Sequence, residues 1–189
     1  MSPPILQQPL PYAGRLDERA VDTIDLVVIH CTELPDLDTA RRFGEKIHYP
    51  DSQTGNSGHY YIDRDGTVEQ WVNNARIAHH VRAYNQRSLG IELVNSGRYP
   101  DWFHSDRQQM TEPYPDRQLE ALQGLLGQLE GIFSSLRFIT GHEELDREML
   151  PSSDRPEIMV RRKRDPGPLF PWDRVLAATR LKYVTAEDL

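Results

Sequence analysis

The chain has 189 residues, a length that suits one domain with a proper hydrophobic core. Lys and Arg total 22 against 29 Asp and Glu, which gives a formal net charge of −7. Because binding to nucleic acid and to anionic membranes normally rests on basic surfaces, this balance predicts neither as a partner.

Two features of the sequence bear on its compartment. The only cysteine, Cys31, cannot form an intramolecular disulfide, which suits a reducing environment. The N-terminal residues lack the basic region and apolar stretch of a secretory signal, and no apolar run is long enough to span a bilayer. We therefore expect a cytoplasmic protein.

The first half of the chain predicts a strand, a helix and a hairpin. Residues 1–22 are rich in proline and polar groups and predict an arm on the surface. The β-branched run 24–29, closed by a histidine, is typical of a buried central strand. Apolar residues at helical spacing in 38–48 predict the first helix, and a polar loop follows over 50–58. Residues 59–71, with an Asp-Gly turn in the middle, predict a β-hairpin.

The second half of the chain predicts further strands and a long helix. Residues 88–95 form an apolar strand, and a long amphipathic helix follows residues 115–116. Residues 138–139 predict a short strand, and 146–162 is a charged stretch that we expect to be irregular. A terminal helix is expected over 172–181.

This order of elements predicts an α/β fold, because strands alternate with helices around one hairpin. We expect a single domain over residues 23–181, with a central mixed β-sheet flanked by helices. The arm 1–22 precedes it, and residues 182–189 form a C-terminal tail. The sequence specifies no oligomeric state.

Three residues are candidates for a metal site at the edge of the sheet. His30 ends the buried strand, and His142 follows a glycine that lets the backbone turn sharply. Asp165 opens a proline-rich turn that would hold its carboxylate in place. Two imidazoles and a carboxylate suit catalytic Zn²⁺ and leave a fourth position for water. A histidine at a strand end is more often structural, so the residues alone leave both interpretations open.

Two further residues are candidates for catalysis. Glu92 interrupts an apolar strand, where a buried carboxylate is costly unless it is paired or functional; the alternative is a position on the strand's solvent face. Lys163 lies in a basic run that is typically solvated. If this approach to Asp165 is extended, residues two apart share a face, which predicts Lys163 on the ligand's side and Arg164 on the other.

Together these residues resemble the N-acetylmuramoyl-L-alanine amidase family. That family includes AmpD-type muropeptide amidases, phage amidase lysozymes and peptidoglycan recognition proteins. The resemblance covers roughly residues 23 to 176 and is specific because its blocks follow the family's order. The blocks are Ile-His-Cys-Thr at 29–32, Gly-His-Tyr-Tyr-Ile-Asp-Arg-Asp-Gly at 58–66, Ser-Leu-Gly-Ile-Glu-Leu at 88–93, Thr-Gly-His at 140–142 and Lys-Arg-Asp-Pro-Gly at 163–167.

The resemblance implies roles for the candidate residues. His30, His142 and Asp165 would be the zinc ligands, with the aspartate similar to the AmpD-type branch. Glu92 would be the catalytic glutamate, and Lys163 would assist at the zinc site.

The resemblance also implies residues beside the substrate cleft. His79 matches a family histidine there, with Asn85 as a second substrate-binding candidate. His59 matches a histidine that we take as structural. The family often has tryptophan before the cleft histidine, whereas this chain has Ala78, so a stacking surface would be missing.

The implied function is zinc-dependent hydrolysis of the amide bond between N-acetylmuramic acid and L-alanine. The partners would be peptidoglycan fragments or muropeptides. The alternatives are a non-catalytic muropeptide-binding module and a zinc peptidase that acts on cell-wall peptides. For residues 146–162, the alternatives are a lid over the cleft and a surface insertion.

Overall fold

The most apolar run of the chain lies at the centre of a sheet. In the computed structural model, which describes residues 3–189, strand β2 (Leu26–Cys31) is buried along its whole length. Strands β5 (Ser88–Leu93) and β6 (Phe138–Gly141) run parallel to it on either side. Parallel strands covered on both faces favour near-continuous apolar sequence, which fits the apolar character of β2.

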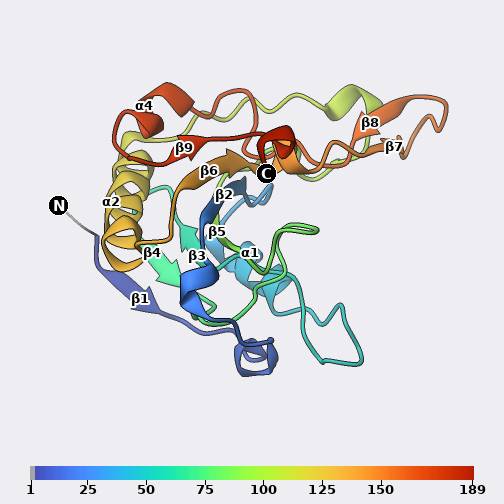
Figure 1. Cartoon of the computed structure of the whole chain (residues 1–189). Helices are drawn as coiled ribbons and strands as arrows, with labels where there is room; N and C mark the ends of the chain where they lie inside the picture. Colours follow the sequence, from blue (N-terminus) through green and yellow to red (C-terminus); the bar gives the residue numbers. More distant parts are fainter. Residues whose placement is uncertain (1–2) are drawn as a thin grey trace.

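The remaining strands complete a seven-stranded mixed sheet in the order β1-β4-β3-β5-β2-β6-β9 (Figure 1). Strand β3 (Tyr60–Ile62) is parallel to β5 and antiparallel to β4 (Val68–Gln70). Strand β1 (Ile5–Gln7) and strand β9 (Lys182–Tyr183) form the two edges. The predicted hairpin and the predicted mixed sheet are thus confirmed.

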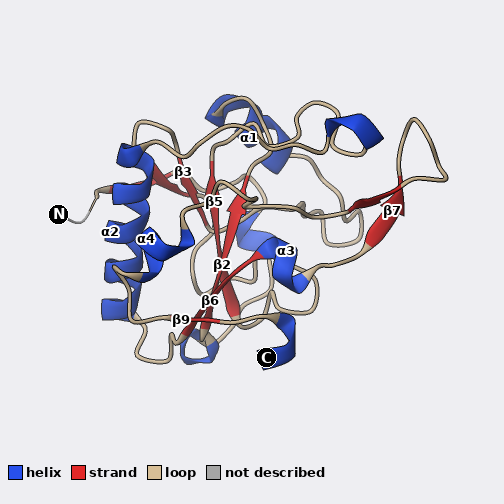
Figure 2. Cartoon of the chain, turned by 90° about the horizontal axis from the view of Figure 1, so that it is seen from above, coloured by secondary structure: helices blue, strands red, loops and turns tan. Residues whose placement is uncertain are grey.

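Helices cover both faces of this sheet (Figure 2). Helix α2 (Asp116–Ile132) packs its leucines against one face, with the short helix α4 (Trp172–Leu176) beside it. Helix α1 (Leu37–Gly44) packs on the opposite face, near Trp71. Burial of several fully enclosed leucines, each contributing about 1.5–3 kcal/mol, makes the α2 face the main source of packing stability.

Alternation along the strands places two candidate residues on the face away from α2. Val27, Ile29 and Cys31 point into the α2 core, so His30 between them points to the other side. Glu92 pairs in register with His30, and residues in register on adjacent strands share a face. The sheet therefore brings these two side chains together at the C-terminal ends of its central strands.

The N-terminal arm is more integrated than a surface segment. In its described part, residues 3–22, β1 joins the sheet edge, and Leu10, Tyr12 and Leu16 are buried in the cluster around α1. The first two residues of the predicted arm lie outside the described range. Short 3-10 helices occur at Ala13–Arg15, Val21–Thr23, Ser105–Arg107 and Ala186–Asp188.

Several segments differ from the sequence-based expectations. The first helix ends at Gly44 rather than at residue 48. The terminal helix ends at Leu176 rather than at residue 181, and Lys182 and Tyr183 pair with β6 at the edge of the sheet.

The charged stretch 146–162 is not wholly irregular. It contains an antiparallel pair, β7 (Met149–Pro151) and β8 (Met159–Arg161), which extends away from the sheet (Figure 1). The one-turn helix α3 (His142–Leu145), which the sequence did not predict, precedes it. Among the described residues, no helix is both long and apolar enough to cross a membrane.

Gln118 of α2 offers a test of this packing. Its side chain is fully buried, and its Nε2 donates to the carbonyls of Ile62 and Val94, both at 2.9 Å. We expect Gln118→Leu to lower the free energy of unfolding by about 1–3 kcal/mol in urea titrations, because buried carbonyls lose a donor. The control is Gln128→Leu on the same helix, whose partly exposed amide donates to Pro3. An equal loss in both variants would contradict this account.

Candidate active site

Three side chains from distant parts of the chain converge at the end of β2. His30 is the penultimate residue of that strand, His142 begins α3 directly after β6, and Asp165 follows β8 in a turn. The Nδ1 atoms of His30 and His142 lie 2.9 and 3.0 Å from the same oxygen, Oδ2 of Asp165. All three side chains are 4% exposed or less.

This geometry fits a metal ion. Zn²⁺ at roughly 2.0–2.1 Å from tetrahedral ligands separates their donor atoms by about 3.3 Å, close to the spacing observed. Within the described residues, the second oxygen of Asp165 and Nε2 of His142 are buried without a hydrogen-bond partner. A buried carboxylate is costly unless a positive charge or donors compensate it, which a divalent cation would do.

The protonation states also suit ligation, which requires neutral imidazole and ionised carboxylate. Burial, aided by His142, lowers the pKa of His30 to about 4, so this imidazole is neutral at physiological pH. Burial acts against ionisation of Asp165, but His142, His30 and Lys163 together hold its pKa well below the usual range.

A second group of potential ligands does not have these properties. His104, Asp106 and Asp154 also lie close together, but the two carboxylates are exposed. Arg155 forms ion pairs with both of them, and Asp154 additionally accepts from Ser105. Since charges already present in the protein compensate these carboxylates, we interpret the group as a surface ion-pair cluster.

Glu92 lies beside the converging ligands. Its Oε1 is 3.9 Å from Nδ1 of His30, and its side chain is 14% exposed. A Cβ at Gly58 would lie 2.8 Å from Cγ of Glu92, so glycine at that position makes room for this carboxyl group. Burial raises the pKa of Glu92 to about 8, the carboxylate of Asp165 adds to the rise, and Lys163 opposes it.

These residues lie in an open cleft with a volume of about 610 Å³. Lys163 lines this cleft together with Glu92 and the three converging side chains, whereas Arg164 is absent from the lining. The structure therefore places the two adjacent basic residues in different surroundings, as expected from an extended approach to Asp165.

The other predicted cleft residues have distinct positions. His79 lines the cleft and packs edge-on against Tyr49, with ring centroids 4.9 Å apart. Asn85 does not line it; its side-chain oxygen accepts from the backbone N–H groups of His80 and Val81 at 3.0 and 2.8 Å. A contact between Asn85 and substrate stays a prediction.

Two more histidines lie behind His30. His59 is fully buried, and its Nδ1 accepts from the backbone N–H of Gly90, which agrees with a structural role. His80 lines the cleft, and its Nδ1 lies 3.0 Å from Nε2 of His30. The sequence analysis did not single out His80, although two adjacent histidines in a loop were a signal that either could face the site.

Comparison with known proteins identifies the family. A family model described as N-acetylmuramoyl-L-alanine amidase matches residues 20–168. The chain belongs to this family. It is an enzyme, an N-acetylmuramoyl-L-alanine amidase.

Individual relatives are distant. The amidase is 23% identical over 142 residues to an endolysin of Escherichia phage T7, a match that covers 75% of this chain and 89% of the endolysin. A solved endolysin, LysCS of Clostridium intestinale URNW, has a TM-score of 0.66 at 20% identity, covering 96% of this chain and 99% of that one. AmiD of E. coli, solved with anhydro-N-acetylmuramic acid-L-Ala-D-gamma-Glu-L-Lys, has a TM-score of 0.64 at 23% identity, covering 87% and 61% respectively. These solved structures have the same fold.

A buried arginine supports one wall of the amidase's cleft. Arg98 donates from Nε and Nη2 to the two carboxylate oxygens of Glu33, at 2.7 and 2.8 Å. Its other N–H groups reach the side chain of Gln108 and the carbonyls of Arg161 and Arg162. Every donor of the guanidinium group is therefore used, which is what a buried arginine requires.

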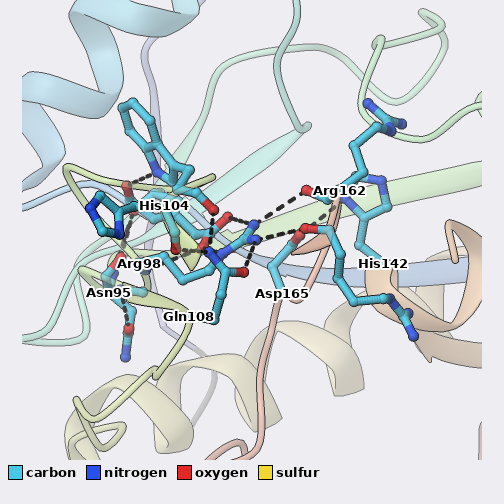
Figure 3. Close-up of polar contacts among 12 residues, drawn as sticks. Asn95, Arg98, His104, Gln108, His142, Arg162 and Asp165 are labelled. Atoms are coloured by element: carbon cyan, nitrogen blue, oxygen red, sulfur yellow. Dashed lines mark hydrogen bonds and ion pairs between the residues drawn. The ribbon is translucent and has the colours of Figure 1, made fainter. Parts of the chain in front are cut away.

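This network fixes the backbone just before the catalytic candidates. Figure 3 shows Arg98 between Gln108 on one side and Arg162 and Asp165 on the other. The two carbonyls that Arg98 binds belong to residues 161 and 162, directly before Lys163. The sequence analysis missed this arginine, because three of its four partners lie more than sixty residues away and two of these are backbone groups.

We expect Arg98→Ala to lower the free energy of unfolding by about 3–5 kcal/mol, because it leaves the buried Glu33 carboxylate unpaired. The double variant Arg98→Ala/Glu33→Gln should be more stable than Arg98→Ala, since the unpaired charge is gone. Urea unfolding of both proteins measures the difference. A double variant less stable than Arg98→Ala would contradict this interpretation of the pair.

Proposed function

We propose that this amidase uses Zn²⁺ to hydrolyse the bond between N-acetylmuramic acid and L-alanine in peptidoglycan fragments. The observation that carries the proposal is the convergence of two imidazole nitrogens on one carboxylate oxygen, beside Glu92 in an open cleft. The muropeptide bound by the structurally similar AmiD supports soluble fragments as the substrate class.

His30, His142 and Asp165 would hold the metal ion and leave one coordination position open. An amide is a poor electrophile and water is a poor nucleophile at neutral pH. Zinc would supply the missing reactivity by lowering the pKa of water from about 15.7 to roughly 7. The chain itself must then move protons and stabilise charge.

Glu92 would move the proton. Its carboxylate lies on the strand next to His30, within 3.9 Å of the metal-facing nitrogen, so it borders the position where the attacking water would be. It would accept the proton of that water and return it to the nitrogen of the leaving alanine. Burial raises the pKa of this carboxyl group to about 8, and the charge of a bound divalent cation would favour the ionised form that accepts a proton.

Lys163 would stabilise the developing oxyanion. It lines the same cleft, and its charge acts on both Glu92 and Asp165. A compact ammonium group is a point charge that can approach a developing negative oxygen, which a broader guanidinium does not reproduce.

Digestion of a purified anhydro-muropeptide, followed by mass spectrometry, tests the proposal. We expect the intact sugar to separate from an intact peptide headed by L-alanine. A chelator should abolish the reaction, and added zinc should restore it. Shortened peptides would instead indicate a peptidase, and binding without cleavage would indicate a binding module.

Glu92→Gln tests the proton-transfer role. The amide keeps the side chain's shape but cannot accept the proton, so we expect turnover to fall roughly 10²- to 10⁴-fold with zinc content unchanged. Glu143→Gln is the matched control: burial also raises the pKa of that carboxyl group, to about 7, but it does not line the cleft. Turnover of Glu92→Gln close to that of the control would remove Glu92 from the mechanism.

Lys163→Ala and Arg164→Ala test the electrostatic role, since the two residues are adjacent and equally charged. We expect Lys163→Ala to lower the catalytic rate tenfold or more, each tenfold step being about 1.4 kcal/mol of barrier, with zinc content unchanged. Arg164→Ala should stay close to wild type. Equal rates in the two variants would show that Lys163 has no specific catalytic role and belongs to a solvated basic run.

A further inference from the structure

We propose that His80 is a positioning residue that directs the lone pair of His30 Nδ1 toward the metal. The proposal rests on the proposed zinc function of the site. It concerns Nε2 of His30, the ring nitrogen that faces away from Asp165, and the chain of hydrogen bonds that begins at this atom.

Four groups form this chain. Nε2 of His30 lies 3.0 Å from Nδ1 of His80, and Nε2 of His80 lies 3.1 Å from Oγ of Ser88. The hydroxyl of Ser88 lies 2.8 Å from the carbonyl oxygen of Tyr84. Both nitrogens of His80 are therefore engaged within the protein, and neither is free to bind substrate.

Counting protons along this chain gives two arrangements, each of which sets the tautomer of His30. A hydroxyl carries one hydrogen. If Ser88 donates it to Tyr84, Oγ can only accept, so the proton of His80 lies on Nε2 and its Nδ1 is an acceptor. His30 must then donate from Nε2, which leaves the Nδ1 lone pair directed toward Asp165. This is the tautomer that a metal ion requires.

The same chain has a second arrangement with the same number of protons. If Ser88 instead donates its hydroxyl proton to Nε2 of His80, the ring proton of His80 lies on its Nδ1 and is donated to Nε2 of His30. The ring proton of His30 then lies on its own Nδ1. His30 then donates to Oδ2 of Asp165 at 2.9 Å and has no lone pair for a metal. The carbonyl of Tyr84 keeps a bond from the N–H of Arg87, so this reversal leaves it with a partner. Metal binding selects the first arrangement.

The fold holds the His80 ring in place for this purpose. A Cβ at Gly90 would lie 2.7 Å from His80 ring atoms, so glycine lets the ring lie directly on β5. Asn85 fixes the backbone of His80 through its side-chain oxygen. By contrast, Nε2 of His142 has no partner among the described residues. Within the part of the chain that the structure describes, only one of the two histidine ligands is oriented from behind by the protein.

Zinc affinity of three variants tests the role of His80, independently of turnover. The oxygen of Asn can occupy the position of Nδ1 and accept from His30, whereas Leu has a similar shape and accepts nothing. In competition with a chelator, we expect His80→Leu to raise the zinc dissociation constant about 10- to 100-fold, and His80→Asn to restore most of the affinity. The control His79→Leu, one residue earlier on the cleft wall, should bind zinc like wild type.

A second measurement needs no substitution. In ¹⁵N spectra of histidine-labelled wild-type protein, zinc should move the proton of His80 from Nδ1 to Nε2. The proposal is overturned if His80→Leu binds zinc within twofold of wild type, if Asn is as weak as Leu, or if the His80 tautomer does not respond to zinc. A wild-type chain that takes up no zinc would overturn the proposed function together with this inference.

Discussion

The carboxylate of Asp165 is buried between two imidazoles, and the site is built around compensating its charge. Burial of an isolated carboxylate costs several kcal/mol, so such a group persists only with partners on several sides. The partners here are Nδ1 of His30 and of His142, each about 3 Å away, and the positive charge of Lys163. Its second oxygen still lacks a partner among the described residues, which is the deficit that a divalent metal ion would fill.

The parallel sheet makes this arrangement possible. Strands β2, β5 and β6 end at the same edge, so a residue near the end of each is brought to one place without any long loop. The register of β2 and β5 places Glu92 next to His30. The core formed with α2 on the opposite face of the sheet holds these strands in position. The loop after β8 has no neighbouring strand to position it. The hydrogen bonds of Arg98 to the carbonyls of Arg161 and Arg162 hold the backbone there instead.

The parts that could be predicted from the sequence are those with a local pattern. The strand ending at His30, the strand containing Glu92 and the long helix α2 each have an apolar periodicity, and the structure has all three. The candidate ligands came from ordered blocks that resemble a family, because a spacing of more than a hundred residues between His30 and His142 has no distinctive pattern of its own. The chemical roles of these residues stay predictions.

The parts that could not be predicted depend on contacts between distant residues. Arg98 pairs with Glu33, and in the sequence both look like ordinary surface charges. His80 differs from His79 only in which way the loop turns them, and Asn85 determines that turn through backbone N–H groups. The β7–β8 hairpin is short and rich in charge, so its alternation is too brief to separate it from an irregular loop.

The central claim is that one zinc ion is bound jointly by His30, His142 and Asp165. Anomalous diffraction at the zinc edge, from crystals of the wild-type chain grown with zinc, tests it most directly. We expect one strong peak about 2.0–2.2 Å from Nδ1 of both histidines and from a carboxylate oxygen of Asp165. A peak only at the exposed His104 cluster, or ligation through Nε2 of His30, would contradict it.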